Sequence, residues 1–379
     1  MKHFDVAIIG SGPSGASTAY HLSKKGISTV IIEKETLPRY KTCGGGLVFR
    51  GRNNLPFDIA EIVEREFFSI DIYLSAKLHF ITQRDEPSIT MIMRDAFDKL
   101  MTDKAKAEGA VLLESHKLQS LSFKDKLISL VTSQGTITAN FVIAADGALS
   151  PTAKMAGWIE ETRNLIPALE YEVEVASEDF KRLSKNVRFD IDAIPYGYAW
   201  SFPKKNHLSI GVASARRTKV NLKKYYQAYL ETLGITTIIS ELQHGFQIPV
   251  TPRTDGFVKN NVFLIGDAAG FADPITAEGI SNAIYSGKLA AEAIIETEKH
   301  HEKAAELYMK KLEATLIPEL KTGVWLSKWF YEQKTLRNLL AKKYGQRITE
   351  EMINVFHGDR TYPKDVKQKL KQKIKELVF

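Results

Sequence analysis

The stretch from Phe4 to Lys34, FDVAIIGSGPSGASTAYHLSKKGISTVIIEK, predicts the main fold of this chain. An apolar strand over 6–9 runs into Gly10-x-Gly12-x-x-Gly15, a helix follows to about residue 24, and a second apolar strand covers 29–32. Gly10 suits a tight turn, Gly12 lets the backbone approach a pyrophosphate, and Gly15 lets helix and strand pack closely. The helix N-terminus then faces the phosphates. The stretch therefore predicts a dinucleotide site in a parallel α/β sheet.

The second strand of this unit ends at an acidic residue. Glu33 follows Gly15 by 18 residues, close to the spacing of about 20 expected for an acid that binds a ribose. Its neighbour Lys34, and Pro13 and Ser14 at the helix start, complete the set expected at this end of the cofactor. Strand, turn, helix, strand and acid are all in place, but they do not distinguish NAD from FAD.

A second strand-to-helix junction lies near residue 265. The run Val262–Ile265 is apolar, as in a strand buried on both faces, and it breaks at Gly266-Asp267. A turn over 274–279 follows, and an Ala/Ile-rich helix is expected from about Ile280. A carboxylate at the end of a strand and a helix N-terminus beyond it are how an open α/β sheet holds a cofactor. A similar edge occurs where the apolar strand 140–145 ends at Asp146.

A loop with three consecutive glycines follows the first unit, in the run Arg39-Tyr-Lys-Thr-Cys43-Gly44-Gly45-Gly-Leu. Such a loop can press its backbone against a flat ligand, and Arg39 can meet phosphate charge. A flexible surface loop is the alternative. Arg94, at the start of a helix expected over 94–108, is a further candidate for binding.

Near residue 168 the pattern changes to that of an antiparallel sheet with one solvent-exposed face. Alternation is clear over 169–175 and 187–191, weaker over 207–212, and it also predicts one half-buried strand over 68–81. At strand spacing, Tyr196, Tyr198, Trp200 and Phe202 all point one way. They form either the wall of a pocket or ordinary core, and this pattern leaves both open.

Length and composition limit the remaining possibilities. The 379 residues exceed a single core, so two or more packed units are expected. The single cysteine excludes an intrachain disulfide. No apolar run reaches the roughly 20 residues of a membrane span, and the strand by residue 4 leaves no room for a cleaved leader. We therefore expect a cytoplasmic monomer with no metal site.

The net charge of +7 is concentrated in one part of the chain. Residues 300–379 hold 17 Lys/Arg and 10 Asp/Glu, a difference of +7, so the remaining residues are balanced. This distribution argues against nucleic-acid binding by the main body. A last helix after Pro363 carries an apolar stripe at 366, 370, 374 and 377/378 and lysines at 364, 367, 369, 371, 373 and 375. Such a helix fits either a peripheral membrane surface or packing on the body.

Three motifs together carry a family resemblance. They are Lys41-Thr-Cys-Gly-Gly-Gly-Leu47, the Tyr-x-Trp-x-Phe-Pro run of 198–203, and Gly266-Asp-Ala-Ala-Gly270 continuing through Pro274 and Glu278-Gly279. With the glycine turn, they make the chain resemble the geranylgeranyl reductase family of flavoproteins over roughly residues 3–300. The resemblance implies an α/β fold: a Rossmann-like FAD-binding domain of the glutathione reductase and para-hydroxybenzoate hydroxylase type, with an antiparallel-sheet substrate domain and a helical C-terminal region. The boundaries expected are 1–66, 94–165 and 254–299 for the FAD domain, 67–93 and 166–253 for the substrate domain, and 300–379 for the helical region.

The resemblance also implies residue roles. The glycine turn and Glu33 would bind the adenosine and pyrophosphate of FAD, with Arg39 and Arg94 on the phosphates. Asp267 would hold the ribitol chain, and Gly279 and Ile280 would bring backbone N–H groups to the pyrimidine edge of the ring. One position departs from the pattern: the family has a glycine between Thr276 and Glu278, whereas this chain has Ala277.

The implied reaction is reduction of isoprenoid double bonds in a lipid, quinone, tetrapyrrole or prenyl diphosphate. An isolated alkene is not electrophilic, so a proton must accompany the hydride. Cys43 is the first candidate acid, since a thiol in apolar surroundings stays protonated, and Tyr198 is the second.

Two other functions are possible for this fold. One is a monooxygenase or halogenase, whose Trp-x-Trp-x-Ile-Pro run resembles 198–203, and the other is a non-catalytic membrane-associated electron-transfer flavoprotein. The sequence has a single glycine turn, which FAD would occupy, and so no second dinucleotide-binding domain is expected for NADPH. The electron donor is therefore either NADPH bound transiently or a ferredoxin.

Overall fold

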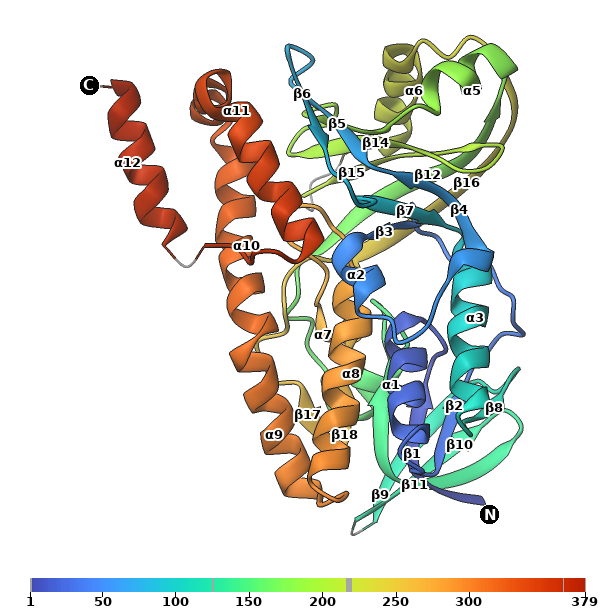
Figure 1. The fold of residues 1–379 in the computed structure, drawn as a ribbon. Helices are drawn as coiled ribbons and strands as arrows, with labels where there is room; N and C mark the ends of the chain where they lie inside the picture. Colours follow the sequence, from blue (N-terminus) through green and yellow to red (C-terminus); the bar gives the residue numbers. More distant parts are fainter. Residues whose placement is uncertain (1, 125, 216–219, 364, 379) are drawn as a thin grey trace.

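A computed structural model describes residues 2–124, 126–215, 220–363 and 365–378 of the chain. Figure 1 shows a parallel-cored sheet at the end that holds the N-terminus and a second, antiparallel sheet at the opposite end. Helices of the C-terminal part run along one side of both. The described helices include none that is long and apolar enough to cross a bilayer.

The first sheet has eight strands, with a parallel centre. Their order is β17 (Val258–Lys259), β18 (Val262–Leu264), β11 (Gly135–Ala144), β1 (Lys2–Ile9), β2 (Thr29–Ile32) and β8 (Val111–Leu113), with β10 (Leu127–Thr132) and β9 (Leu118–Lys124) continuing from β11. β1 pairs in parallel with β2 and β11, placing Val6 beside Thr29 and Phe141. The apolar runs read from the sequence are these central strands, because both faces of the sheet are covered.

Helices cover this sheet and pack on one another. They are α1 (Pro13–Ser23), α3 (Arg94–Ala107) and α8 (Ile280–Glu296), with the short α4 (Pro151–Met155) and α7 (Gly266–Ala269) at strand ends. α1 lies between α3 and α8 (Figure 1). The N-terminus of α1 follows β1, and α7 and then α8 follow β18, so these helix starts meet at the carboxyl edge of the sheet. This edge is where open α/β sheets bind ligands.

The second sheet has seven strands. Their order is β16 (Ile238–Pro249), β12 (Leu165–Val175), β15 (Leu208–Ser214), β14 (Gly197–Pro203), β13 (Val187–Ile191), β5 (Ser69–Leu74) and β6 (Leu78–Gln83). One face packs on α6 (Leu222–Leu233), near α5 (Ser177–Leu183), through a core that includes Leu169, Tyr226 and Tyr229. The opposite face carries the aromatic residues of β14 and turns toward the first sheet and the C-terminal helices.

A small third sheet and α2 connect the two large ones. The sheet has the order β3 (Gly46–Val48), β7 (Ile89–Ile92) and β4 (Val63–Phe67), and α2 (Phe49–Asn53) follows β3 and contacts α8. The glycine-rich loop that precedes β3 is therefore held between the two large sheets.

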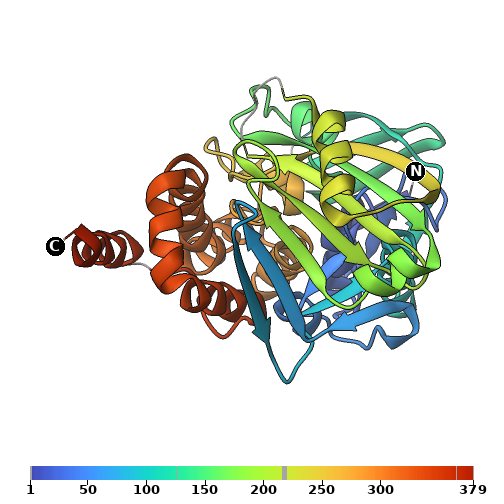
Figure 2. The ribbon, with the colours of Figure 1, turned by 90° about the horizontal axis from the view of Figure 1, so that it is seen from above.

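Four helices complete the chain: α9 (His301–Ala314), α10 (Leu316–Glu332), α11 (Lys334–His357) and α12 (Val366–Val378). α9 packs on α8, and α11 packs on β6. Seen from above in Figure 2, α10 and α11 lie beside the seven-stranded sheet, while α12 stands furthest from the body. The helix expected after Pro363 is thus α12. The expected lysine at 364, and the side chains expected at 371, 374, 375, 377 and 378, lie outside what the structure describes.

Two sequence predictions in this half of the molecule are wrong. The single strand expected over 68–81 is a hairpin, because Ser75 and Ala76 adopt left-handed φ values of 53° and 54° and turn the chain. Alternation continues across this turn, so the pattern could not reveal it. Tyr196 also fails to join the aromatic face, because it precedes β14 with φ 55° and is 36% exposed.

Candidate active site

The glycine turn between β1 and α1 has the geometry that its sequence predicts. Gly10 has φ 103°, and a Cβ there would lie 2.5 Å from the carbonyl oxygen of Ala145. A Cβ on Gly15 would lie 2.1 Å from the Gly10 carbonyl, so neither glycine tolerates a side chain. Gly12 caps α1 without a side-chain hydrogen bond, and Pro13 follows it. The first-turn N–H groups of α1, including that of Ser14, remain available to a phosphate.

Glu33 lies at the end of β2, buried and already hydrogen-bonded. It accepts from the backbone N–H of Ser11 at 3.0 Å and from the Ser11 hydroxyl at 2.6 Å. Burial by itself raises the pKa of Glu33, but these bonds and the charge of Arg39 outweigh burial and lower it. Glu33 is therefore a fixed carboxylate, ready to accept from a ribose hydroxyl. The predicted neighbour Lys34 is instead exposed and lies beside Glu35.

Arg39 and Arg94 meet at one buried carboxylate. Arg39 donates to Asp98 at 2.9 Å, and Arg94, the first residue of α3, donates to the same group at 2.8 Å. A Cβ on Gly12 would lie 3.8 Å from the Arg94 guanidinium, which places this cation beside the glycine turn. Burial opposes the charge, but the charge and hydrogen bonds of Asp98, with a smaller contribution from Cys43, outweigh burial and raise the pKa of Arg94. Arg94 thus adjoins both the phosphate position and the thiol.

Asp146, the acid at the end of β11, is used within the protein. Its carboxylate accepts from the Ser150 hydroxyl at 2.5 Å and from the Thr152 backbone and hydroxyl at 2.9 and 2.6 Å. These contacts hold the start of α4. The carboxylate is thereby tied to the local turn and not presented to the cleft.

Asp267 differs from Asp146. Its carboxylate accepts no hydrogen bond from any residue that the structure describes, although Oδ1 would lie 3.4 Å from a Cβ on Gly279. Burial raises the pKa of Asp267, and the charges of Lys41 and Arg94 oppose that rise. An enclosed carboxylate without donors fits the hydroxyls of a ribitol chain. Together with the open glycine turn, it shows that the residues present fit FAD.

The turn between α7 and α8 is held by its own side chains. Asp273 accepts from the backbone N–H groups of Ile275 and Thr276, both at 2.9 Å. Ala277, where the family has glycine, adopts φ 56° in the left-handed region. Gly279 then starts α8 without a side-chain cap, so the N–H of Ile280 is directed out of the helix end.

The loop of Cys43 is clamped between the two sheets. A Cβ on Gly44 would lie 3.0 Å from the Phe202 ring, and one on Gly45 would lie 2.1 Å from the Ile92 carbonyl. Lys204, which is fully buried, donates to the carbonyl oxygens of Gly44 at 2.7 Å and Ile92 at 3.0 Å. The alternative interpretation as a flexible surface loop is therefore wrong. Lys204 is not among the residues predicted from the sequence, where its one signal is that a lysine directly follows an apolar strand.

The surroundings of Cys43 are only partly apolar. Its side chain packs near the cluster that contains Ile280 and Ile284. It also accepts from the Gly45 N–H at 3.4 Å, and it lies close enough to Arg94 to affect the pKa of that guanidinium. The expectation of purely apolar surroundings is therefore wrong, because α3 brings a cation to the sulfur.

Three of the four predicted aromatic residues share one face of β14. Tyr198, Trp200 and Phe202 are buried in one cluster, which also contains residues of α10 and α11. The Tyr198 hydroxyl donates to the Thr276 carbonyl at 2.5 Å. Burial raises the pKa of Tyr198, so this hydroxyl stays protonated. Both interpretations of the aromatic run hold in part, because the cluster is core and also adjoins a cavity.

An apolar cavity of about 100 Å³ lies between this face and the C-terminal helices. Its lining includes Phe189 and Tyr198 from the sheet, Thr276 from the turn before α8, and Ala341 and Met352 of α11, which form the roof. Its lining is almost entirely hydrocarbon, as a site for an apolar chain requires. The cavity thus borders the turn before α8, where the sequence expects the flavin ring.

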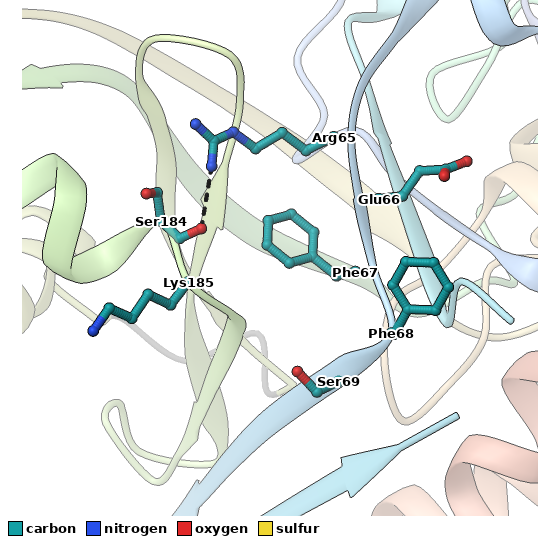
Figure 3. Close-up of a pocket in the computed structure, with 7 residues that line it drawn as sticks. All are labelled: Arg65, Glu66, Phe67, Phe68, Ser69, Ser184 and Lys185. Carbon is teal, nitrogen blue, oxygen red and sulfur yellow. Dashed lines mark hydrogen bonds between the residues drawn. The ribbon is translucent and has the colours of Figure 1, made fainter. Parts of the chain in front are cut away.

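A separate depression of about 400 Å³ is lined by other residues. Figure 3 shows its residues from β4, β5 and the loop after α5, with Arg65 donating to the Ser184 carbonyl at 3.2 Å. It contains none of the predicted site residues. We assign it no role.

Family comparisons agree with this geometry. A profile described as "FAD binding domain" matches residues 60–309, and one described as "FAD dependent oxidoreductase" matches residues 5–63. A digeranylgeranylglycerophospholipid reductase of Methanosphaera stadtmanae is 30% identical over 81% of this chain and 82% of its own. The chloroplastic geranylgeranyl diphosphate reductase of Arabidopsis thaliana is 27% identical over 92% of this chain and 78% of its own.

Solved structures share the fold. A geranylgeranyl bacteriochlorophyll reductase-like protein of Thermoplasma acidophilum has a TM-score of 0.80 at 24% identity, covering 98% of this chain and 100% of its own. A flavin-dependent brominase has a TM-score of 0.74 at 19% identity, covering 99% of each chain. With the matched profiles, the relatives and the open FAD site, the chain is an FAD-dependent oxidoreductase that belongs to the geranylgeranyl reductase family.

Proposed function

We propose that this protein reduces carbon–carbon double bonds in the isoprenoid chain of a lipid. The observation that carries the proposal is the apolar cavity lined by Tyr198 and Thr276, which borders the turn expected to hold the flavin ring. The relatives named as prenyl reductases support the same substrate class. When bound and reduced, FAD supplies the hydride for such a reaction.

The protein's own residues would supply the proton. Cys43 is the first candidate, because its thiol lies in the loop clamped against the aromatic strand. The nearby charge of Arg94 supports this role, since a cation stabilises the thiolate that remains after the proton leaves. Tyr198 is the weaker candidate, because its hydroxyl proton already bonds the Thr276 carbonyl.

The substrate must enlarge the cavity. Its volume of about 100 Å³ is smaller than the 300–1,000 Å³ typical of small-molecule sites. The sheet wall is held by strand pairing, whereas the roof consists of side chains from α10 and α11. We infer that these helices shift outward when the chain enters. Ile348, which lines the cavity and is 48% exposed, marks the entrance.

The C-terminal helix suggests where the substrate comes from. α12 is the outermost helix, and its lysines at 367, 369 and 373 give it a positive charge that suits an anionic surface. We propose that it holds the protein on the membrane that contains the substrate. NADPH and a ferredoxin are the two candidate electron donors.

A monooxygenase or halogenase is the second candidate, because the brominase shares the fold. An electron-transfer flavoprotein without a substrate of its own is the third. Oxygen separates the first two: FAD-loaded protein, reduced with dithionite under argon, should reduce geranylgeranyl lipids, whereas a monooxygenase needs oxygen. Cys43→Ala should keep its FAD and lose at least tenfold in this rate. Full turnover in Cys43→Ala would exclude the thiol as the acid.

A further inference from the structure

Four residues form a straight row across the seven-stranded sheet. Trp200 of β14 pairs with Gly211 of β15, Gly211 pairs with Glu170 of β12, and Glu170 pairs with His244 of β16. Directly paired residues point to the same face of a sheet. The row therefore crosses from the aromatic face beside the cavity to the outer edge strand.

The segment that contains Cys43 covers this row. The Tyr40 ring stacks on His244 with centroids 4.0 Å apart, and a Cβ on Gly44 would lie 3.2 Å from the Trp200 indole nitrogen. The Trp200 ring occupies the space beside Gly211, where a Cβ would approach it to 2.1 Å. Glu170 thus lies in the middle of the row, between the positions covered by Tyr40 and Gly44.

Three members of the row hold a buried polar atom without a hydrogen-bond partner among the described residues. These atoms are Glu170 Oε2, Trp200 Nε1 and His244 Nε2. A buried polar atom left unpaired is costly, and native structures contain few. Three such unpaired atoms in one row of side chains indicate a place where small polar groups or protons are exchanged. Glu170 itself is only 2% exposed.

Several groups face the Glu170 carboxylate. The Ser209 hydroxyl donates to Oε1 at 2.6 Å, Glu172 adds a like charge, and Lys204 adds an opposite one. Tyr40 and His244 lie on the solvent side. Burial and then Glu172 raise the pKa of Glu170 from 4.5 to about 7, so the group can hold or release a proton near neutral pH.

We propose that Glu170 is the internal proton source that reloads Cys43 after each reduction, and that His244 connects Glu170 to solvent. This inference rests on the proposed function. In each turnover the thiol proton forms a new C–H bond on one alkene carbon, and a hydride forms the other. The thiolate then takes the proton of the Glu170 carboxyl, and the carboxylate regains a proton from solvent past His244. One proton enters for each double bond reduced, and no water need cross the apolar cavity.

Glu170 acts through Cys43 and is therefore a positioning and supply residue. The chain has one cysteine, so alkylation by iodoacetamide reports on Cys43 alone. In FAD-loaded wild type, the pH profile of alkylation should show an added inflection near pH 7, because the ionised carboxylate disfavours the thiolate. Glu170→Gln should lose that inflection, and Glu170→Asp should keep one.

Glu172→Gln is the matched control on the same strand. Removing its charge should move the inflection to lower pH without abolishing it. In multiple turnover with a prenyl lipid, Glu170→Gln should be slowed about a hundredfold. His244→Phe should keep a normal first turnover and slow the later ones.

An alkylation profile in Glu170→Gln that matches wild type would overturn the inference. If the wild-type protein reduces no prenyl lipid, the proposed function is wrong. The alkylation profiles would in that case still show whether ionisation of Glu170 affects the reactivity of Cys43. Equal multiple-turnover rates for Glu170→Gln and wild type would reject the supply role even if the two groups are coupled.

Discussion

The Tyr198 hydroxyl donates a 2.5 Å hydrogen bond to the carbonyl oxygen of Thr276 and so ties β14 to the turn before α8. From α10, Tyr331 donates to the neighbouring Ile275 carbonyl at 2.7 Å. The turn that would border the flavin ring is thus fixed by the substrate-side sheet and by the cavity roof. A shift of α10 would therefore also move this turn, because the Tyr331 hydrogen bond connects the two.

Tyr198→Phe tests whether this hydroxyl positions the turn or donates the proton. The change leaves a buried carbonyl unpaired, so the free energy of unfolding should fall by about 1–3 kcal/mol in urea titrations. Alkene reduction should stay within about tenfold of wild type. Tyr331→Phe, which removes the companion bond, should show a similar loss of stability. A thousandfold loss of rate in Tyr198→Phe alone, with FAD bound, would identify Tyr198 as the acid.

Ala277→Gly should stabilise the protein. Ala277 adopts φ 56°, a region that costs a non-glycine residue about 1 kcal/mol. Part of the gain is offset by the greater freedom of glycine in the unfolded chain. Ala76→Gly, at φ 54° in the β5–β6 turn, is the matched control: it should change stability similarly without changing FAD affinity. A marked destabilisation by Ala277→Gly would contradict the assignment of strain to this turn.

Glu170→Gln should alter how stability depends on pH. The folded-state pKa of about 7 exceeds the ordinary 4.5, so the folded protein binds more protons than the unfolded chain between these values. Stability from this group is therefore full below about pH 4.5 and is lost as pH rises through about 7. The advantage of Glu170→Gln over wild type should grow by about 3 kcal/mol from pH 4.5 to pH 8. Parallel stability curves for the two proteins would show that Glu170 titrates normally.

Met352→Trp should fill the cavity. Met352 lies in the roof on α11, so the larger ring should weaken prenyl-lipid reduction by at least tenfold while FAD content stays normal. Overpacking should cost about 1–3 kcal/mol of stability. Leu339→Trp, at a 47% exposed position on the same helix, should leave turnover unchanged. Equal rates for Met352→Trp and wild type would place the substrate elsewhere.

Removal of residues 363–379 should weaken binding to vesicles that contain anionic lipid. Each lysine near such a surface contributes about 1 kcal/mol, so co-sedimentation should fall steeply at low salt. FAD should remain bound, since α12 contributes no residue to the candidate active site. Unchanged sedimentation of the shortened protein would assign membrane contact to another surface or to none.

The sequence predicted the local geometry of the glycine turn and of the junction before α8, because the signals for both are local. Gly10 to Gly15 lie within one turn, and Gly266 to Ile280 span one strand-to-helix junction, so spacing alone indicates their geometry. The start of α8 at Ile280 is where the Ala/Ile-rich pattern placed it. Glu33 is likewise close in sequence to the turn that it supports.

The substrate half depended on contacts between distant segments, which spacing could not supply. Lys204 clamps a loop about 160 residues earlier, and Glu170 meets that loop from β12. Neither lies in a motif. The cation beside Cys43 was missed for the same reason: Arg94 was recognised as a binding residue, but only the packing of α3 brings it to the sulfur.

The most direct test of the account is the mass of a geranylgeranyl lipid after incubation with FAD-loaded, dithionite-reduced protein under argon. The account predicts mass gains in multiples of two hydrogens, reduced at least tenfold in Cys43→Ala and unaffected by the absence of oxygen. An unchanged lipid, or a product that forms only when oxygen is admitted, would contradict it.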